Sequence, residues 1–301
     1  MENIHKPVNI AIVGCGYWGP NLIRNFYQTN DVKVSYVCDS NKEKLKNIKK
    51  LYPDIKLSES YSEVLQNEDI DALCIVTPLS THYKIAKEAL LAGKHVLVEK
   101  PFVQTSKEAK ELIELAKEKK RVLMVDHTFI YTGAVQKIKD LSLKGELGEI
   151  IYFDSERINL GLIRKDANVL WDLAVHDISI IDYLISQKPL SVSALGSSPI
   201  LRGGEEMAHL AIKHEGGIVS HVHVSWLSPL KIRKVLVGGT KKMVLYDDVE
   251  PTEKIKIYDR GVDIDMNAVT PFSPLYRSGD ILIPKIDQTE ALKNLCEHFI
   301  G

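Results

Sequence analysis

A carboxylate and an imidazole four residues apart, Asp172 and His176, form one of the pairs in this sequence best suited to proton transfer. They lie in an apolar, helix-compatible stretch from Leu170 to Ile185, and residues four apart share one face of a helix. A histidine titrates near neutral pH, so it can act as a general base or a general acid. From the spacing alone, a helix N-terminal carboxylate beside a hydrogen-bonded core histidine remains the open alternative.

A glycine-rich segment near the N-terminus has the spacing of a dinucleotide-binding turn. Gly14, Gly16 and Gly19 follow a β-branched run and precede an apolar-periodic stretch. In such a turn the first glycine allows the tight bend, the second lets the backbone approach a pyrophosphate, and the third lets the helix pack on the strand. Asp39 stands about twenty residues further on, at the end of the next strand-like run. It would accept hydrogen bonds from the adenosine ribose and repel a 2′-phosphate, which predicts NAD and makes NADP less favoured.

The dipeptide Thr77-Pro78 follows a third apolar strand-like run. Ligands in open α/β sheets bind outside the carboxyl ends of the strands. We therefore expect this dipeptide to line the nicotinamide side of the cofactor site, with simple strand termination as the alternative. Lys42 or Lys44, just after the second strand, would soften the repulsion between a 2′-phosphate and the aspartate there.

Polar residues in the second half of the chain are candidates for binding substrate. Arg157 and Asn159 lie at the end of an apparent strand and would suit hydroxyl groups or a phosphate, because the planar guanidinium matches phosphate geometry. Lys165 and Asn168 are further candidates. For each of these four residues, a surface or loop role without ligand contact is the alternative.

Strand-like and helix-like segments alternate over the first 126 residues. Near-continuously apolar strands separated by helices indicate a parallel sheet covered on both faces, and right-handed crossovers then predict a doubly wound Rossmann domain over residues 1–126. The expected strands are Asn9–Val13, Val32–Cys38, Ala72–Val76, His95–Val98 and Val122–Val125. The expected helices are Asn21–Tyr27, Asn41–Leu51, Thr81–Ala92 and one that begins at the capping box of Thr105 and Glu108.

The pattern changes in residues 127–301, for which we predict an α+β domain with a mostly antiparallel open sheet. Ile218–Trp226 is an expected strand, because within it His221 to Trp226 alternates polar and apolar residues, as a half-buried strand does. His221 and His223 share one face of it, but no third ligand stands nearby, so a polar sheet face is favoured over a metal site. Helices are expected at Gly133–Leu143, Leu170–Ile185 and Gln288–Ile300, and further strands at Ile150–Ile158, Leu190–Leu195, Ala208–Lys213, Ile232–Gly238, Lys242–Tyr246 and Lys254–Tyr258.

Composition narrows the class of protein. The 301 residues carry a formal net charge of -1, which favours neither a nucleic-acid partner nor an anionic membrane surface. No apolar run approaches the ~18 residues of a membrane span, and the N-terminus lacks the apolar core of a signal peptide. The four cysteines form no C-x-x-C pair, a pattern typical of a reducing compartment. We therefore expect a cytoplasmic protein without a structural metal.

Three short motifs in order along the chain carry a family resemblance. Glu99-Lys100-Pro101 follows the glycine-rich segment, His127-Thr128-Phe129 comes next, and Asp172-Leu173-Ala174-Val175-His176 is similar to a D-x-G-x-H signature with Ala174 in place of glycine. Together they resemble the Gfo/Idh/MocA family of sugar and cyclitol oxidoreductases. The resemblance spans nearly the whole chain, although the family often has an arginine near Ile130, where this sequence is apolar.

The resemblance implies how the site residues divide the work. His176 would exchange the hydroxyl proton, Lys100 would stabilise the developing alkoxide, and Asp172 would bind the sugar or tune its neighbours. His127 joins the expected substrate-binding residues. The residues expected to contact the cofactor are Gly14, Gly16, Tyr17, Trp18, Gly19, Asp39, Thr77, Pro78, His82, Glu99 and Lys100.

The expected activity is hydride transfer between a nicotinamide cofactor and a secondary alcohol or ketone of a sugar. Within the family, the segment from Asp126 to Asp182 looks most like relatives that act on nucleotide-linked amino sugars. An inositol or free-sugar dehydrogenase is one alternative, and a non-catalytic NAD-binding sensor is another. In the family the open face of the second sheet forms the subunit interface, which implies a homodimer or a homotetramer.

Overall fold

The computed structural model describes residues 6–161, 163, 167–201, 203–264 and 274–301. The chain forms two compact units, Met1–Thr128 with Thr289–Gly301, and Phe129–Gln288. Each unit is described by itself below. The substrate-binding candidate Lys165 lies outside the described residues.

The first unit contains a six-stranded sheet in the order β3-β2-β1-β4-β5-β6. All of its strand pairs are parallel. This is the strand order of dinucleotide-binding folds, with the change of direction between β1 and β4, so the predicted Rossmann fold is confirmed. The strands are β1 (Val8–Val13), β2 (Val32–Cys38), β3 (Lys56–Ser58), β4 (Ala72–Ile75), β5 (His95–Glu99) and β6 (Leu123–Asp126).

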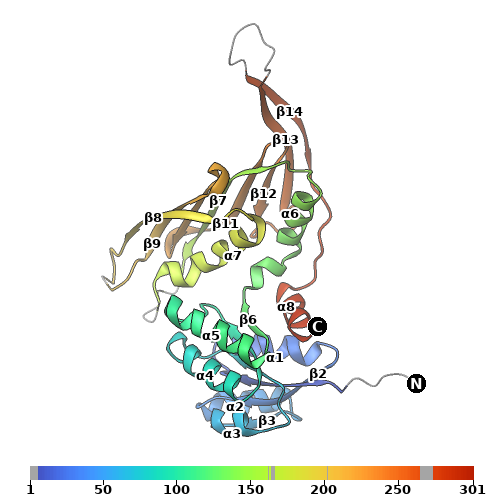
Figure 1. Ribbon diagram of the computed structural model, residues 1–301, viewed down its shortest axis with the longest axis vertical. Coiled ribbons are helices and arrows are strands. Elements are labelled where there is room, and N and C mark those ends of the chain that lie inside the picture. Colours follow the sequence, from blue (N-terminus) through green and yellow to red (C-terminus); the bar gives the residue numbers. More distant parts are fainter. Residues whose placement is uncertain (1–5, 162, 164–166, 202, 265–273) are drawn as a thin grey trace, which may run out of the picture. The chain divides into compact units, whose positions relative to one another are not determined.

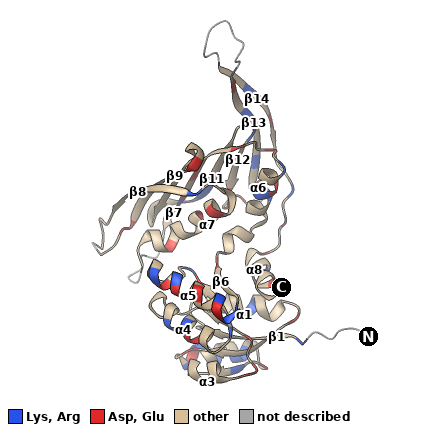
Figure 2. Ribbon diagram, viewed as in Figure 1, with Lys and Arg blue, Asp and Glu red and all other residues tan. Residues whose placement is uncertain are grey.

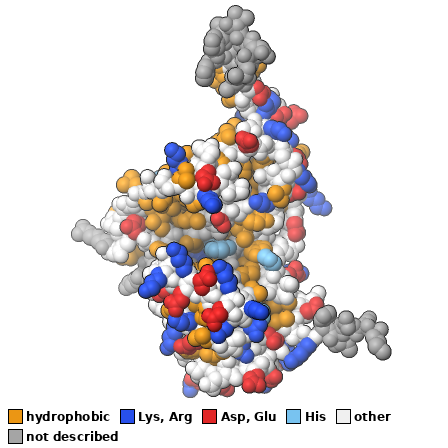
Figure 3. Space-filling model, viewed as in Figure 1, with side chains coloured by type: hydrophobic (Ala, Val, Ile, Leu, Met, Phe, Trp, Pro, Cys, Tyr) orange, Lys and Arg blue, Asp and Glu red, His pale blue; other side chains and the backbone are white. Residues whose placement is uncertain are grey.

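Helices cover this sheet, as Figure 1 shows. They are α1 (Gly19–Gln28), α2 (Lys42–Leu51), α3 (Tyr61–Gln66), α4 (Leu79–Leu91), α5 (Ser106–Lys119) and α8 (Ala291–Ile300). The Thr105 hydroxyl accepts from the Glu108 amide, and the Glu108 carboxylate accepts from the Thr105 amide, so the expected capping box starts α5. Basic and acidic side chains are interspersed along α4 and α5 (Figures 2 and 3), which gives this face no single sign of charge.

The assignment of all residues after 126 to one second domain is wrong at the C-terminal end. Helix α8 belongs to the first unit because its apolar face packs on α1. There the Phe299 and Phe26 rings contact edge to face, with their centroids 6.2 Å apart. Just before α8, the two Glu290 carboxylate oxygens accept from the Arg24 guanidinium at 2.9 and 2.7 Å. The terminal segment thus completes the layer that covers the Rossmann sheet.

The second unit contains an eight-stranded sheet in the order β14-β13-β12-β11-β7-β10-β9-β8. Only the β7–β10 pair is parallel, so the predicted mostly antiparallel sheet is confirmed. The strands are β7 (Ile150–Leu160), β8 (Pro189–Ser197), β9 (Met207–His214), β10 (Val219–Ser225), β11 (Leu227–Gly239), β12 (Met243–Asp247), β13 (Ile255–Ile264) and β14 (Pro274–Leu282).

Two helices, α6 (Gly133–Leu143) and α7 (Val175–Leu184), pack on one face of this sheet and form its core (Figure 1). Short helical turns occur at Thr128–Tyr131 and Glu215–Gly217. The continuous helix predicted over Leu170–Ile185 is wrong in its first turns, because Leu170–Ala174 forms a π-helical segment before α7 begins. Single π-helical turns occur frequently at functional sites.

Candidate cofactor and catalytic site

The glycine-rich turn lies between β1 and α1 at the carboxyl edge of the parallel sheet. Gly14 has a φ of +99°, and a Cβ there would lie 2.5 Å from the Val76 carbonyl oxygen. A Cβ on Gly19 would lie 2.5 Å from the Gly14 carbonyl oxygen. Both positions therefore require glycine for reasons internal to the protein.

Gly16 is different, because its glycine is not required by packing. A Cβ built on it would meet only the Lys44 ammonium, at 3.8 Å. The helix that follows has no side-chain N-cap, and of its first residues Pro20 has no N–H while the Asn21 amide donates to the Trp18 carbonyl oxygen at 3.0 Å. An open surface on the second glycine beside a helix N-terminus is the cradle that a dinucleotide pyrophosphate needs.

Asp39 follows β2 at the same edge of the sheet. One carboxylate oxygen accepts from the Cys15 amide and the other from the Asn41 amide, each at 2.8 Å. Partial burial disfavours the charged form, but the hydrogen bonds from Cys15 and Asn41 outweigh it and lower the pKa of Asp39. An ionised carboxylate can only accept, and each oxygen keeps a further lone pair for a ribose hydroxyl. The residues around the turn therefore fit NAD.

Lys44 is the cation nearest to this cradle, and we predict that it contributes to cofactor affinity. Its ammonium lies beside Gly16, where a charge-assisted contact with a phosphate would form. In Lys44→Met we expect the NAD dissociation constant, measured by calorimetry, to rise about 3- to 10-fold at low salt and less at high salt.

Lys42 provides the matched control, because its ammonium pairs with Glu59 at 3.4 Å on the exposed surface. Lys42→Met should leave NAD affinity within about 2-fold of the wild-type value. Equal effects of the two substitutions would mean that general surface charge, rather than the position of Lys44, determines the affinity.

The two aromatic residues of the turn have different environments. Tyr17 is 91% exposed. The Trp18 indole N–H donates to the buried Asp126 carboxylate at 3.2 Å, and the Thr128 hydroxyl donates to the same group. Asp126, which sequence reasoning did not single out, thus ties the glycine-rich turn to the end of β6. Contact of Tyr17 and Trp18 with the cofactor stays a prediction.

Thr77 and Pro78 connect β4 to α4 at the carboxyl edge of the sheet, and Pro78 is the N-cap residue of the helix. The Thr77 hydroxyl accepts from the Thr81 hydroxyl at 2.7 Å. Their position beside the change of strand direction is the expected one, while contact with the nicotinamide stays a prediction.

The assignment of His82 to cofactor binding is wrong. Its side chain is 1% exposed, and its ring nitrogens face the carbonyl oxygens of Thr77, Pro101 and Phe102. With both nitrogens occupied inside the domain, no ring atom remains for a ligand. The histidine therefore lies between the residues that follow β4 and those that follow β5, and it connects these two loops.

Glu99 ends β5, and Lys100 follows it at the same edge, both half-buried. The Lys100–Pro101 peptide bond is cis. His127 follows β6, and its amide donates to the Val125 carbonyl oxygen at 2.8 Å. Within the first unit, the predicted residues of the glycine turn, Asp39, Thr77, Lys100 and His127 thus all follow the carboxyl ends of parallel strands. Their contacts with cofactor and substrate stay predictions.

In the second unit, Asp172 lies in the π-helical segment and His176 in the first turn of α7. The Trp226 indole N–H donates to the Asp172 carboxylate at 3.1 Å, which orients this half-buried group. The centroids of the His176 and Phe129 rings lie 4.7 Å apart, and the planes of the two rings form an angle of 58°. Trp226 and Phe129 thus support the proposed acid–base pair, and no local sequence pattern connects Trp226 with Asp172.

Arg157 was expected to bind substrate, and the structure places it in the core instead. It is 3% exposed, and its Nε and one terminal nitrogen donate to the two Asp177 carboxylate oxygens at 2.8 and 3.1 Å. Its guanidinium also lies 4.2 Å from the centre of the Phe129 ring. Burial opposes the charge, but the charge and hydrogen bonds of Asp177 outweigh burial and raise the pKa of Arg157. Arg157 therefore contacts Phe129, the ring that lies against His176, from inside the core of the second unit.

The two other described substrate-binding candidates are Asn159 and Asn168. Asn159 is half-buried on β7, and its role stays a prediction. The Asn168 amide donates to the Glu205 carboxylate at 2.6 Å and accepts from the Trp171 amide at 3.1 Å. Asn168 therefore satisfies a backbone amide of the π-helical segment, which is a structural role in addition to any contact with substrate.

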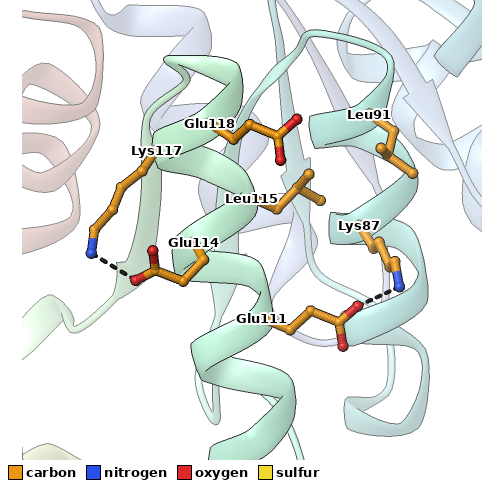
Figure 4. Close-up of a pocket in the computed structure, with 7 residues that line it drawn as sticks. All are labelled: Lys87, Leu91, Glu111, Glu114, Leu115, Lys117 and Glu118. Carbon is orange, nitrogen blue, oxygen red and sulfur yellow. Dashed lines mark hydrogen bonds and ion pairs between the residues drawn. The ribbon is translucent and has the colours of Figure 1, made fainter.

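An open groove on the first unit lies between α4 and α5, away from the carboxyl edge of the sheet (Figure 4). Two ion pairs form among the residues that line it, between Lys87 and Glu111 at 2.5 Å and between Lys117 and Glu114 at 2.8 Å. The described residues include no group of three or more side chains that could hold a metal ion. None of the described helices is long and apolar enough to cross a membrane.

Two models of known families match the chain. One, an oxidoreductase family with an NAD-binding Rossmann fold, matches residues 8–127, and the other, the GFO/IDH/MocA C-terminal domain, matches residues 135–245. The first matched segment spans all six strands of the first sheet, and the second runs from α6 into β12 of the second sheet.

Individual relatives carry names that include sugar and inositol dehydrogenases. UDP-N-acetylglucosamine 3-dehydrogenase of Acidithiobacillus ferrooxidans is 30% identical over 194 residues, which are 64% of this chain and 60% of that protein. A solved structure of the enzyme of that name from the same organism has a TM-score of 0.80 at 24% identity, covering 97% of this chain and 87% of the other. The scyllo-inositol 2-dehydrogenase (NAD(+)) of Bacillus subtilis is 29% identical over 244 residues, or 77% of this chain and 71% of that protein.

The fold, the glycine-rich turn and both family matches agree with the resemblance in the sequence. The chain therefore belongs to the Gfo/Idh/MocA family of oxidoreductases, whose N-terminal domain is an NAD-binding Rossmann fold.

Proposed function

We propose that this protein transfers a hydride between NAD and a secondary alcohol or ketone of a nucleotide-linked amino sugar. The observation that carries the proposal is the pairing of a complete dinucleotide cradle with Lys100 at the same sheet edge. A binding module would need the cradle alone. A lysine directly after β5 supplies the charge that alcohol oxidation needs.

His176 and Lys100 have different tasks in the proposed reaction. When bound, NAD supplies the acceptor for the hydride. His176 accepts the hydroxyl proton in oxidation and returns it in reduction, and its ring is held against Phe129. Lys100 stabilises the negative charge that develops on the same oxygen. Asp172, oriented by Trp226, hydrogen-bonds a substrate hydroxyl or tunes the histidine.

The substrate class is supported by the relative from Acidithiobacillus ferrooxidans, which is named as an enzyme acting on a nucleotide-linked amino sugar. The relative from Bacillus subtilis, named as an inositol dehydrogenase, favours a cyclitol as the second candidate. A non-catalytic NAD sensor would have no use for Lys100 and His176. The four described cysteines are free and buried, which fits a cytoplasmic location for the reaction.

The test is to follow NADH absorbance with purified protein, NAD and separate panels of nucleotide-linked amino sugars, inositols and free sugars. Formation of NADH with a nucleotide-linked amino sugar and not with its free sugar supports the proposal. Turnover of an inositol alone assigns the second candidate. NAD binding without turnover of any panel member in either direction leaves the sensor.

We also propose that the protein is a homo-oligomer that associates through the sheet face opposite α6 and α7. A polar row crosses this face, in which His223 faces Glu156 at 3.2 Å and Lys234 faces Asp247 at 3.5 Å. Exposed leucines flank the row, with Leu195 at 74%. Such a mixture of apolar and paired polar groups is typical of a subunit interface.

Substitution of the flanking leucine tests this interface. We expect Leu195→Asp to shift the mass measured by sedimentation velocity from oligomer to monomer at micromolar concentration, because it buries an unpaired carboxylate. Leu143→Asp, on exposed α6 surface of the same unit, is the control. A monomeric wild-type protein would contradict the proposal.

A further inference from the structure

Phe129 is the aromatic residue of the segment His127-Thr128-Phe129, and its ring contacts three other side chains. It lies in the helical turn Thr128–Tyr131 and packs, partly buried, on the core of the second unit. Its carbonyl oxygen accepts from the Thr132 amide at 3.2 Å and from the Thr132 hydroxyl at 2.8 Å. Two hydrogen bonds therefore fix the backbone of Phe129 just before α6 begins.

Two guanidinium groups lie over the ring of Phe129. The central carbon of the Arg157 guanidinium is 4.2 Å from the ring centroid, and that of Arg233 is 5.8 Å from it. Both distances fall within the ~6 Å over which the negative face of an aromatic ring attracts a cation. Each cation also has a counter-charge. The Asp177 carboxylate lies 2.8 Å from Arg157, and the Asp248 carboxylate lies 3.2 Å from Arg233.

The hydrogen bonds of Arg157 leave one of its nitrogens for the ring. Nε and Nη2 donate to the two Asp177 carboxylate oxygens at 2.8 and 3.1 Å. Within the part of the chain that the structure describes, the buried Nη1 has no hydrogen-bond acceptor. The face of an aromatic ring can accept an N–H group, and the Phe129 ring is placed to serve Nη1 in this way. The electrons of this ring therefore matter as well as its volume.

The same ring contacts the proposed catalytic histidine, with 4.7 Å between the centroids of Phe129 and His176. This distance is within the range that aromatic pairs prefer. His176 is followed directly by Asp177 in the first turn of α7, and Asp177 pairs with Arg157. Phe129, Arg157, Asp177 and His176 thus form a closed cycle of contacts. In a closed cycle the imidazole cannot move without breaking another contact.

We propose that Phe129 is a positioning residue, whose electron-rich ring face, held by Arg157 and Arg233, fixes the imidazole of His176 for proton exchange with the substrate. The inference rests on the proposed function only for the role of His176 in that exchange. The cycle of contacts is a property of the second unit itself, so it can be tested without a substrate.

The sharpest substitutions change the electrons of the ring and keep its shape. Fluorine withdraws electrons from an aromatic ring, so Phe129→difluorophenylalanine weakens the negative face and Phe129→pentafluorophenylalanine reverses it. We expect the unfolding midpoint to fall in steps along this series, by about 2–4 °C for the pentafluoro ring. Equal midpoints along the series would overturn the contact between the ring and the two cations.

Phe153 provides the matched control for fluorination. Its ring is fully buried in the core of the same unit, and among the described residues no cation lies over it. The same two fluorinated residues at position 153 should change the midpoint less than they do at position 129. Equal losses at the two positions would mean that the added volume of fluorine, rather than the loss of ring electrons, determines stability.

Proton NMR of the histidine rings tests the position of the imidazole without a substrate. The His176 signals, assigned by their loss in His176→Gln, should be single in the wild-type protein and displaced by the ring current of Phe129. In Phe129→pentafluorophenylalanine they should broaden or divide, because the imidazole no longer has one position. His176 signals as sharp and as displaced as those of the wild type would overturn the positioning role.

Kinetics test whether that position matters for turnover. In Phe129→Leu we expect kcat to fall about 10- to 100-fold and KM to change less than about 3-fold, because small displacements of a catalytic group are costly. Phe129→Tyr keeps an electron-rich ring and should recover most of kcat. Phe153→Leu, which removes a buried ring elsewhere in the core, should lower the midpoint and leave kcat unchanged.

Two outcomes separate this inference from the proposed function. If Phe129→Leu loses stability as Phe153→Leu does and keeps kcat, the ring of Phe129 is structural and the positioning role is refuted. If the wild-type protein turns over no member of the substrate panels, the proposed function fails. The fluorination series and the NMR signals of His176 then still decide whether Phe129 holds the imidazole.

Discussion

Lys100→Met should reduce kcat by about 1000-fold or more while the NAD dissociation constant changes less than about 3-fold. Methionine keeps the length of the aliphatic stem and removes only the ammonium. That charge is needed chiefly when negative charge develops on the substrate oxygen, so its loss raises the barrier rather than weakening the ground state. The dinucleotide cradle lies in a different loop and stays intact.

His176→Gln should lower kcat by about 100- to 10,000-fold. It should also flatten the limb of the pH profile that reports the base. Steady-state kinetics with the substrate found in the panel, together with calorimetry for NAD, measure both effects. Lys110→Met, an exposed lysine on α5, is the control for charge loss. Full activity of either active-site variant would remove that residue from the mechanism.

The cofactor half of the site was predictable because its signals are local. Gly14 and Gly19 are required by backbone contacts within a few residues, or with a strand that the crossover rule places next to β1. Asp39 occupies the position that its distance from the turn predicts. The short elements β3 and α3 escaped notice, because three and six residues leave too little periodicity to read.

The second half of the site could not be predicted because its contacts join distant residues. Trp226 reaches Asp172 across 54 positions, and the pattern of a half-buried strand gives no sign of it. His82 has the sequence context of an exposed first helical turn, yet it is buried by a loop about twenty residues away. Helix α8 returns to the first unit through contacts with α1, which no local pattern marks.

Arg157, which has the sequence context of a phosphate ligand, is a different case. Its position at the end of a strand suited that role, but its partner Asp177 stands 20 positions away on α7. Alternation on β7 would have placed residue 157 on the covered face, the same face as Phe153 and Ser155. Counting strand parity before assigning chemistry would thus have identified Arg157 as buried.

The buried pair of Arg157 and Asp177 leads to the largest expected effect on stability. Asp177→Ala leaves a guanidinium without its counter-charge in a site that is 3% exposed. Removing one partner of such a pair typically costs about 3–5 kcal/mol, because an uncompensated charge stays buried. We therefore expect the free energy of unfolding of the second unit to fall by about that amount, measured by denaturant titration.

The double variant Arg157→Met with Asp177→Leu distinguishes the pair from simple loss of packing. Replacing both charges by apolar side chains of similar volume removes the desolvation cost, so most of the lost stability should return. Activity should not return, because Arg157 also stacks on the Phe129 ring that contacts His176. A double variant as unstable as Asp177→Ala would show that shape, rather than charge, dominates here. If stability recovers and kcat does not, Arg157 acts on the reaction through the Phe129 ring, which holds the proposed catalytic histidine.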